Sequence, residues 1–294
     1  MNWQRALIKS RVKLNEPLAG KTTFHIGGTA KIFIEPRDAG DLRLLIKLLK
    51  KDRMPYRLIG AGSNLLVSDK GVAAAVIRLS APYFKRIDRK GNSLSAASGL
   101  MLSGLIRSAQ GFGLSGLEFL AGIPGTLGGA LAMNAGAWGA SIGELAQEVE
   151  VLDASGRFRT LRKKNLKFSY RHSNLAEYII LGATLKLAKG TKARIAEQIK
   201  KYLEYRRLNQ DNSLPNAGCV FRNPQGNSAG KLIDLCGLKG KSVGGACVSS
   251  RHANFILNKG DARAKDVLKL MEMIKNKVKV KFSVVLEPEI KIWD

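Results

Sequence analysis

Three glycine-rich segments have the composition of phosphate-binding loops. They are Gly60-Ala61-Gly62-Ser63-Asn64, then Gly122-Ile123-Pro124-Gly125-Thr126 with Gly128-Gly129, and finally Gly136-Ala137-Trp138-Gly139. Glycine lets backbone N–H groups approach phosphate oxygens without a Cβ in the way, and an adjacent Ser or Asn adds a side-chain donor. The first segment matches neither GxGxxG nor GxxxxGK[ST], which argues against those two nucleotide-binding folds. One such segment is usually only a turn, but three in one unit favour a phosphate-rich ligand.

Three polar segments could carry chemistry, and each has a plainer interpretation. Arg171, in residues 168–173, is on sequence alone better explained as a solvated loop charge. Cys219 stands near a glycine, a cation and an amide, which suits a reactive thiol, and equally suits a small buried hydrophobic residue. Strand alternation would place Glu287, Glu289 and Lys291 on one face, but spacing does not show whether either glutamate does more than face water.

Metal and disulfide chemistry find no support. The three histidines lie far apart without ligand-like spacing: His25, His172 and His252. We therefore predict no metal site. The three cysteines, Cys219, Cys236 and Cys247, are odd in number and form no CxxC pair, which favours a reducing compartment. No GxSxG or Ser/His/Asp arrangement stands out.

The formal charge of +26 invites a nucleic-acid hypothesis. However, the cations are spread along amphipathic segments such as 47–53 and 192–207, and aromatic residues make up only 6% of the chain. Solvated helix faces explain most of them, and a field that attracts small polyanions is the second interpretation. The uncharged stretch 119–143 is rich in glycine and suits a buried loop-and-helix element rather than a membrane span. Residues 1–13 lack a signal-peptide core, so we expect a cytoplasmic protein.

Periodicity predicts the elements that must position these residues. We expect helices at 38–53 and 100–111, strands at 57–59, 72–79 and 178–187, and a hairpin of 148–153 with 157–161. A charged helix at 191–209 follows, with its buried side formed by Ile195, Ile199, Tyr202 and Leu203. Beyond it we expect helices near 228–236 and 262–277 and strands at 254–257 and 284–293. The main boundary is predicted at 188–191.

Taken together, the chain resembles the UDP-N-acetylenolpyruvoylglucosamine reductases over nearly its whole length. The similarity is carried by seven segments, namely residues 15–28, 59–66, 117–139, 170–173, 217–224, 238–258 and 286–290. The resemblance implies an α+β protein. Its first part, 1–188, would be an FAD-binding domain of the vanillyl-alcohol-oxidase type, with lobes of about 1–80 and 81–188. Its second part, 189–294, would be a smaller α+β substrate domain.

The resemblance also implies the chemistry. In this family NADPH reduces FAD and leaves, and the enolpyruvyl UDP-sugar then takes its place and is reduced to UDP-N-acetylmuramate for peptidoglycan synthesis. The cofactor-binding residues would be Gly60, Ala61, Gly62, Ser63, Asn64, Leu65, Gly122, Ile123, Pro124, Gly125, Thr126, Asn134, Ala135, Gly136 and Gly139. Arg171 and Glu289 match catalytic positions that stabilise charge on the substrate carboxylate. Tyr170, Asn223 and His252 match substrate-binding positions.

Cys219 falls where many members carry the serine that donates a proton to the substrate. A thiol, with a reference pKa of about 8.5, is a far stronger acid than a serine hydroxyl, so the exchange is chemically reasonable. Two other departures stand out. Asn209-Gln210-Asp211 replaces a Lys-Gln-Pro-like sequence, and too few residues separate Arg171 from Tyr178 for the tyrosine-bearing insertion of one subtype.

Two alternatives remain open from the residues alone. One is another enzyme on the same flavin-binding lobe, such as an oxidase of a small alcohol. The other is a basic nucleic-acid-binding protein, whose duplex binding would fall steeply with salt. The favoured hypothesis expects a monomer that binds a UDP-sugar and NADPH, without specific nucleic-acid binding or membrane insertion.

Overall fold

A computed structural model of the chain describes residues 10–294. The first nine residues, which belong to the segment interpreted as lacking a signal peptide, lie outside this range. The chain forms two compact units, each assembled from separate stretches of sequence. The first contains the segment that ends at Leu14, Ile32–Ala61 and Ala74–Tyr205, and the second contains Asn15–Lys31, Gly62–Ala73 and Arg206–Asp294.

The N-terminal sheet has the strand order β1-β2-β5-β3, namely β1 (Arg11–Pro17), β2 (Thr29–Glu35), β5 (Val72–Arg78) and β3 (Tyr56–Ile59). Helix α2 (Ala39–Lys51) follows β2, as the spacing of its apolar residues predicts. The Asp38 side chain accepts a hydrogen bond from the Asp41 backbone N and so caps the helix. Leu42, Leu45, Ile46 and Leu49 are buried against the sheet residues Ile32, Ile34, Ala75 and Ile77.

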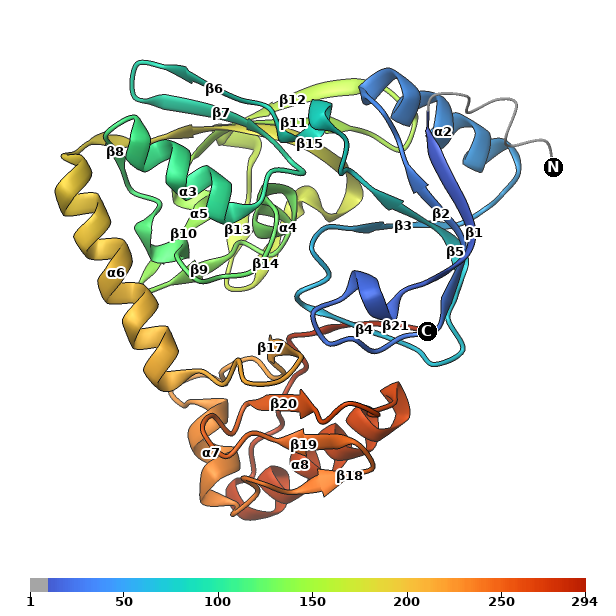
Figure 1. The fold of residues 1–294 in the computed structure, drawn as a ribbon, viewed down its shortest axis with the longest axis vertical. Helices are drawn as coiled ribbons and strands as arrows, with labels where there is room; N and C mark the ends of the chain where they lie inside the picture. The colour runs from blue at the N-terminus through green and yellow to red at the C-terminus, as the bar shows by residue number, and fades with distance from the viewer. Residues whose placement is uncertain (1–9) are drawn as a thin grey trace. The chain divides into compact units, whose positions relative to one another are not determined.

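A five-stranded antiparallel sheet forms the second layer of the first unit (Figure 1). Its order is β12 (Phe158–Arg162), β11 (Ala146–Leu152), β15 (Ile179–Lys186), β7 (Ser93–Ala97) and β6 (Ile87–Lys90). Helices α3 (Leu102–Gly111), α4 (Leu127–Ala132) and α5 (Ile142–Leu145) pack with this sheet in one hydrophobic core. Helix α3 begins two residues later than predicted, because Met101 is extended and bridges Thr126.

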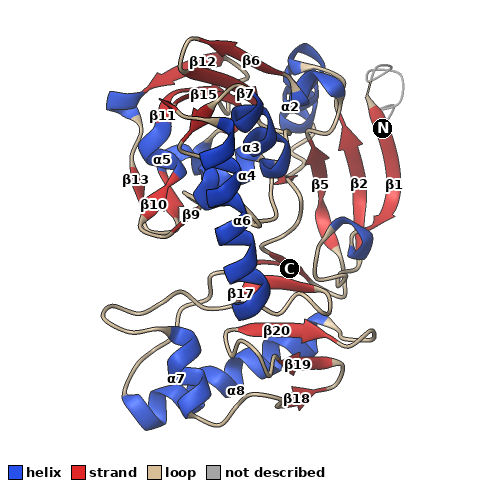
Figure 2. Cartoon of the chain, turned by 60° about the vertical axis from the view of Figure 1, so that its left-hand side comes forward, coloured by secondary structure: helices blue, strands red, loops and turns tan. Residues whose placement is uncertain are grey.

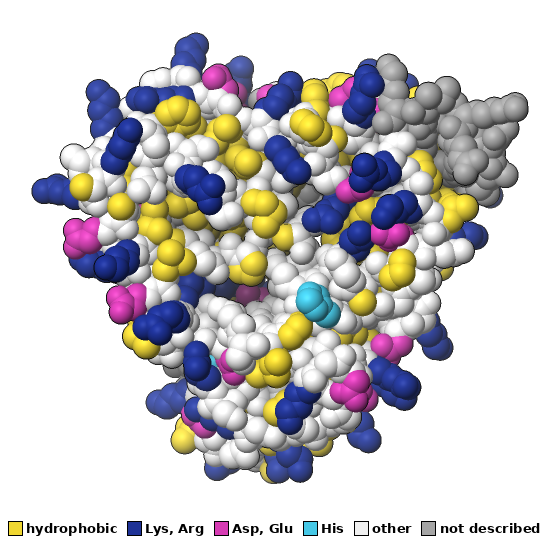
Figure 3. All heavy atoms as spheres, in the orientation of Figure 1, with side chains coloured by type: hydrophobic (Ala, Val, Ile, Leu, Met, Phe, Trp, Pro, Cys, Tyr) yellow, Lys and Arg dark blue, Asp and Glu magenta, His cyan; other side chains and the backbone are white. Residues whose placement is uncertain are grey.

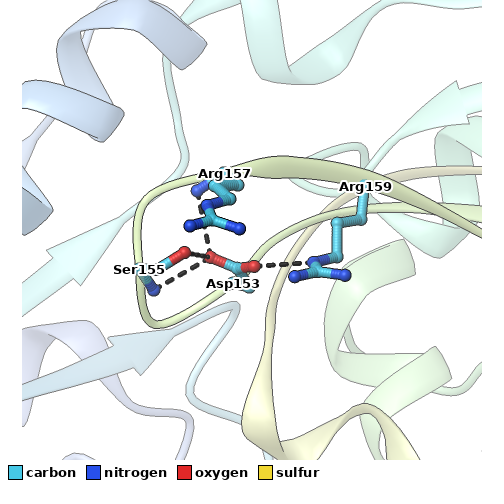
Figure 4. Close-up of polar contacts among 4 residues, drawn as sticks. All are labelled: Asp153, Ser155, Arg157 and Arg159. Carbon is cyan, nitrogen blue, oxygen red and sulfur yellow. Dashed lines mark hydrogen bonds and ion pairs between the residues drawn. The ribbon is translucent and has the colours of Figure 1, made fainter.

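The predicted hairpin is confirmed as β11 and β12, and its turn is held by one carboxylate (Figure 4). Asp153 Oδ1 accepts hydrogen bonds from Ser155 N at 2.9 Å, Ser155 Oγ at 2.6 Å and Arg157 N at 3.0 Å. Oδ2 pairs with Arg159 Nε at 2.6 Å. These bonds, first those from Ser155 and then those from Arg157 and Arg159, hold the pKa of the Asp153 carboxyl far below its usual range.

Short elements connect the layers of this unit. Three short strand pairs are β8 (Leu114–Ser115) with β16 (Ala188–Lys189), β9 (Gly136–Ala137) with β10 (Ala140–Ser141), and β13 (Phe168–Ser169) with β14 (His172–Ser173). Four 3₁₀ turns lie at Pro82–Lys85, Glu118–Leu120, Lys163–Asn165 and Asn174–Glu177. The stretch 119–143 is thus a loop-and-helix element, as predicted. Among the described residues, no helix is long and apolar enough to cross a membrane.

Helix α6 (Lys192–Asn209) is confirmed, but its buried side is narrower than predicted. Only Ile195 is buried, Ile199 and Tyr202 are partly buried, and Leu203 is 45% exposed. The prediction for Leu203 is therefore wrong. Helical periodicity identifies an apolar stripe, but it does not show how far along the helix a neighbour covers that stripe.

The second unit contains an antiparallel sheet with two helices (Figure 2). Its order is β17 (Asn216–Cys219), β20 (Phe255–Asn258), β19 (Ala246–Val248) and β18 (Ser242–Val243), with helices α7 (Ala229–Leu235) and α8 (Ala264–Phe282). A separate parallel pair joins β4 (Leu65–Val67) to β21 (Lys291–Trp293). The core combines Phe24, Ile26 and Leu66 with apolar residues of the C-terminal segment. A 3₁₀ turn, Ala19–Lys21, also lies in this unit.

The C-terminal elements differ from the predictions at two places. Helix α8 extends to Phe282, five residues beyond the predicted end. The predicted strand 284–293 is wrong for residues 284–290, since only β21 forms a regular strand. Pro288 lacks an N–H and makes just an isolated bridge with Phe221, which explains why no ladder forms there. The predicted common face of Glu287, Glu289 and Lys291 therefore does not exist as a strand face.

Candidate functional site

The first glycine-rich segment begins against the second one. A Cβ at Gly60 would lie 2.7 Å from Thr126 Oγ1, so only glycine allows this approach. Thr126 caps α4 by accepting a hydrogen bond from Gly129 N at 3.3 Å. Its segment is fixed by backbone bonds from Leu102 N to Gly125 O and from Leu127 N to Leu100 O, both 2.9 Å. The predicted cofactor segments 60–61 and 122–126 therefore meet at Thr126.

The other half of the same loop contacts the backbone that carries Glu289. Gly62 has a positive φ of 66°, and a Cβ there would collide with the Lys21 carbonyl oxygen. Asn64 Nδ2 donates to Glu289 O at 3.2 Å, and Lys291 N donates to Asn64 O at 2.9 Å. The end of the glycine loop and a predicted catalytic residue, more than two hundred positions apart, thus lie together.

Arg171 lies at the tip of the β13–β14 hairpin, beside the third glycine segment. Its Nη1 donates to Gly136 O at 3.1 Å, and its guanidinium lies 5.4 Å from the centre of the Tyr170 ring. Glycine is required at 136 because a Cβ would come 2.5 Å from Ala140 O. Arg171 is therefore held by the protein and is not a free loop charge. Tyr170 beside it is 55% exposed.

Asn134 holds this hairpin in place. The residue is buried and has a positive φ of 44°. Its Nδ2 donates to Ser169 O and its Oδ1 accepts from Gly143 N, both at 3.0 Å. Its amide thus links the hairpin that carries Arg171, at Ser169, to helix α5, at Gly143. The predicted cofactor-binding residues Asn134, Ala135, Gly136 and Gly139 belong to the turn on which the arginine rests.

Cys219 ends strand β17 at an irregularity in the ladder. The register with β20 shifts between Asn216 and Cys219, where Gly218 has a positive φ of 74°. Such bulges redirect the side chains that follow them. Cys219 is opposite Phe255 and is partly exposed, so it is not a buried hydrophobic residue. Of the two interpretations left open for this thiol, a small buried hydrophobic residue does not agree with its partial exposure.

The residues after Cys219 connect it to Glu289. Glu289 N donates to Val220 O at 2.8 Å, and Arg222 N donates to Glu287 O at 2.9 Å. On the other side, Asn254 brackets Phe221: its Oδ1 accepts from Phe221 N and its Nδ2 donates to Phe221 O. Segment 219–222 therefore lies between the Glu289 backbone and β20. The Glu287 side chain faces water, and its contact with Arg222 Nη1 is long, at 3.9 Å.

Asn223 and His252 flank the first turn of α7. Asn223 Oδ1 accepts a hydrogen bond from Ala229 N at 3.0 Å, and a Cβ on Gly230 would lie 3.5 Å from His252 Cε1. The His252 ring packs on Phe255 at 4.6 Å between ring centres. Burial lowers the pKa of His252, and nearby Lys239 adds to the effect. The ring is thus neutral at pH 7, and because Nδ1 accepts from Asn254 N at 3.3 Å, its proton lies on Nε2.

The predicted site residues thus form two groups. One, in the first unit, gathers Gly60, Thr126, Asn134, Gly136 and Arg171; the other, in the second unit, gathers Asn64, Cys219, Asn223, His252 and Glu289. Arg251, which the sequence analysis did not single out, shares a turn with His252. A separate cleft of about 820 Å³ in the first unit, lined by residues such as Glu118, Lys189, Arg194 and Tyr202, contains none of the predicted site residues.

Comparison with known proteins matches both parts of the chain. Residues 30–162 match the FAD binding domain family, and residues 209–293 match the C-terminal domain of UDP-N-acetylenolpyruvoylglucosamine reductase. The FAD binding domain match spans all three glycine-rich segments.

Individual proteins extend the match to nearly the whole chain. A UDP-N-acetylenolpyruvoylglucosamine reductase of Alkaliphilus oremlandii is 44% identical over 283 residues, covering 96% of this chain and 93% of that protein. The crystal structure of the corresponding Thermus caldophilus reductase is 38% identical with a TM-score of 0.83, covering 97% of this chain and 99% of that one.

A more distant structure bears on the fold alone. Physcomitrella patens BBE-like 1 has a TM-score of 0.50 at 14% identity, covering 64% of this chain and 45% of its own. With the two family matches, this confirms the expected fold class, an α+β protein with an FAD-binding part and a smaller C-terminal part.

Proposed function

On the premise that this chain belongs to the UDP-N-acetylenolpyruvoylglucosamine reductase family, we propose that Arg171, Cys219 and Glu289 carry its chemistry. The chain is a flavin-dependent reductase that uses FAD and NADPH to reduce the enolpyruvyl UDP-sugar in peptidoglycan precursor synthesis. This identity favours the reductase over the alcohol oxidase and the nucleic-acid-binding protein. The proposal concerns which of its residues do the work.

We propose that the cofactor is held by the glycine segments. Gly60 to Leu65 would cradle its diphosphate, and residues 122–126 with 134–139 would line the flavin. When bound, FAD supplies hydride that it has taken from NADPH. The chain's part is to present backbone N–H groups and to keep the turn at Gly136 closed under Arg171.

Arg171 would hold the substrate carboxylate, where negative charge grows during reduction. A guanidinium that is already oriented by Gly136 O and the Tyr170 ring needs little reorganisation when that charge appears. Glu289 would add a carboxyl contact, at a backbone position fixed by Val220 O and Asn64 Nδ2. Tyr170, Asn223 and His252 would bind the substrate, with neutral His252 donating from Nε2.

Cys219 would donate the proton that the substrate α-carbon receives. The observation that carries this assignment is the position of Cys219: a partly exposed thiol on a bulge, one residue before the Val220 carbonyl to which Glu289 N is bound. A thiol has a lower reference pKa than any hydroxyl side chain, so it gives up a proton more readily to an enolate-like carbon.

The test separates the two half-reactions. Cys219→Ala should leave flavin bleaching by NADPH intact but slow flavin reoxidation by the UDP-sugar roughly 10²–10⁴-fold, the range for loss of a general acid. Cys219→Ser should retain activity. Normal turnover of Cys219→Ala would show that another group donates the proton. Cys236→Ala is the matched control, because this partly exposed thiol lies at the end of α7.

The same preparation tests the cofactor and the wider assignment. We expect a yellow protein that oxidises NADPH only when the enolpyruvyl UDP-sugar is present. A colourless protein that takes up no FAD on reconstitution would contradict the family assignment itself. It would also leave the Cys219 experiment without meaning.

We also propose the finer organisation that the sequence predicts. Residues 1–188 would form the FAD-binding domain and 189–294 the substrate domain, an arrangement supported by the positions of the two family matches. We infer that the protein is a monomer, since one chain supplies every proposed residue. We also infer that it is cytoplasmic. Specific nucleic-acid binding is not expected, because lysines and arginines are scattered over the visible face with acidic side chains between them (Figure 3). Light scattering and salt-dependent duplex binding test these two points.

A further inference from the structure

The turn that carries His252 is tied to a fully buried serine. Residues 249–252 connect β19 to β20. Ser249 is 0% exposed, and its Oγ accepts hydrogen bonds from Arg251 N and His252 N, both at 3.0 Å. The same Oγ donates its own proton to Asp211 Oδ2 at 2.6 Å. One hydroxyl therefore fixes the backbone of two consecutive residues and is itself fixed by a carboxylate.

Asp211 anchors this arrangement from the segment just after α6. The residue is 7% exposed, and its Oδ1 accepts from Ser213 N at 3.2 Å and Ser213 Oγ at 2.5 Å. Burial raises the pKa of the Asp211 carboxyl, but the hydrogen bonds from Ser213 and Ser249 outweigh it and keep the carboxyl ionised. A buried carboxylate with several donors is costly to rearrange, so the turn is rigid.

Arg251 projects from this turn with its guanidinium oriented, and after the hydrogen bonds its charge also helps to keep the Asp211 carboxyl ionised. Its Nη1 donates to Arg207 O at 3.1 Å and lies 3.5 Å from Gln210 O, at the C-terminal end of α6. The carbonyls of a last helical turn lack intrahelical donors, so they favour a guanidinium there. The side chain is exposed, and within residues 10–294 no carboxylate forms an ion pair with it. An arginine has five donors, and most of them remain for a ligand.

We propose that Arg251 binds the diphosphate of the UDP-sugar, and that the buried pair Asp211–Ser249 positions it for this contact. A planar guanidinium matches two phosphate oxygens at once. Neighbouring His252 supplies a neutral donor, and the same hydroxyl orders both residues. The inference rests on the proposed function, since it needs a nucleotide-sugar substrate. It gives Asp211, part of the departure Asn209-Gln210-Asp211, a role as a positioning residue.

The first experiment removes the cation in the FAD-loaded enzyme. Arg251→Gln should raise the KM for the UDP-sugar roughly 10–100-fold while kcat falls less than threefold, because the diphosphate lies away from the reacting carbons. Arg251→Lys should recover part of the loss. The matched control is Lys259→Gln, which removes an exposed charge from the same unit and should change KM less than twofold.

NADPH also carries a diphosphate, and stopped-flow reduction of the flavin separates the two ligands. A raised KM for the UDP-sugar, with or without weaker NADPH binding, supports the proposal. An unchanged KM for the UDP-sugar overturns it, as does weaker NADPH binding alone. A protein that fails to reduce its flavin or to turn over the UDP-sugar at all would instead count against the proposed function.

The second experiment tests positioning. Ser249→Ala and Asp211→Asn should each raise the KM for the UDP-sugar about 3–10-fold in an otherwise wild-type chain. Each effect should be smaller in an Arg251→Gln chain, where only the part that acts through His252 remains. Ser249→Thr keeps the hydroxyl but adds a methyl group at a fully buried position, so it should recover only part of the wild-type KM. Lower thermal stability without a change in KM, or a full effect of Ser249→Ala in the Arg251→Gln chain, would reduce the pair to a structural role and overturn this part.

Discussion

The glycine-rich segments and the cluster around β17 and β20 contribute to the proposed site in opposite ways. Gly60, Gly62 and Gly136 matter for the atoms they lack, because a Cβ at each would meet a neighbour. Cys219, Asn223 and His252 matter for the side-chain atoms they present, each held by hydrogen bonds or packing around it. The first region defines a shape and the second supplies chemistry. Substitutions should therefore fail differently in the two: by loss of cofactor in one, and by loss of individual steps in the other.

The largest effect should come from filling the glycine loop. Gly62→Ala adds a Cβ that collides with the Lys21 carbonyl, so we expect FAD binding and all activity to be lost. The matched control is Gly91→Ala, since Gly91 also has a positive φ, 60° against 66°, but has open space around it. In both variants the left-handed backbone conformation of alanine destabilises the fold by about 1–2 kcal/mol, and only Gly62→Ala also produces a clash. Absorbance at flavin wavelengths distinguishes them, and equal flavin content would break the comparison.

Replacing Arg171 should reduce activity less than filling the glycine loop does, but more than replacing a surface residue. Arg171→Gln should keep bound FAD and its reduction by NADPH, while reoxidation by the UDP-sugar slows roughly 10²–10³-fold. The reason is that Arg171 would act on the substrate carboxylate. Loss of flavin from this variant would place Arg171 with the glycine segments instead, because its Nη1 also holds the Gly136 turn.

His252, which lies in the cluster around β17 and β20, should make the free energy of unfolding depend on pH. Burial lowers its pKa below the unfolded value of about 6.5, so the unfolded chain binds more protons as the pH falls. Unfolding free energy should therefore decrease below about pH 6.5, by at most about 1.4 kcal/mol per pH unit. The comparison is urea unfolding of wild type and His252→Gln at pH 7.5 and 5.5. Equal pH dependence of the two proteins would mean that His252 protonates without penalty.

The smallest effect should come from the β11–β12 turn, which contains none of the predicted site residues. The low pKa of Asp153 means that its hydrogen bonds stabilise the fold fully above its unfolded pKa of about 3.9 and weaken only as the pH falls below that value. Asp153→Asn should lower Tm slightly at pH 7, and this difference should shrink in acid. FAD content and turnover should stay as in wild type; a change in either would link the turn to function.

Local chemistry made much of the fold predictable. The spacing of Leu42, Leu45, Ile46 and Leu49, and Asp38 before them, identify α2 without any tertiary information. The β11–β12 hairpin follows from two short strand-like segments on either side of the turn Ala154-Ser155-Gly156. Strand 284–290 was predicted wrongly, although Pro288 already argued against a regular strand. Leu203 could not be placed, because its exposure depends on which elements reach the end of α6.

For the proposed site, only the family resemblance supplied roles for individual residues. Glu289 lies beside Val220 and Asn64 through backbone hydrogen bonds that span long stretches of chain. No spacing in the sequence encodes such contacts. Asp211 and Ser249 show the same limit, since a carboxylate and a hydroxyl 38 positions apart become one unit only after folding.

The strand pair of β4 with β21 constrains how the protein folds as it is synthesised. Most of the first unit comes from one continuous run, Ala74–Tyr205, which can pack while later residues are still inside the ribosome. The second unit cannot pack in this way, because β4 pairs with Lys291–Trp293, which is synthesised late. Phe24 and Leu66 likewise pack into a core that is formed mostly by the last third of the chain. The end of the glycine loop, whose Asn64 is bonded to the backbone at Glu289 and Lys291, is therefore among the last parts to take shape. The proposed cofactor loop would therefore reach its final form only after Lys291–Trp293 has left the ribosome.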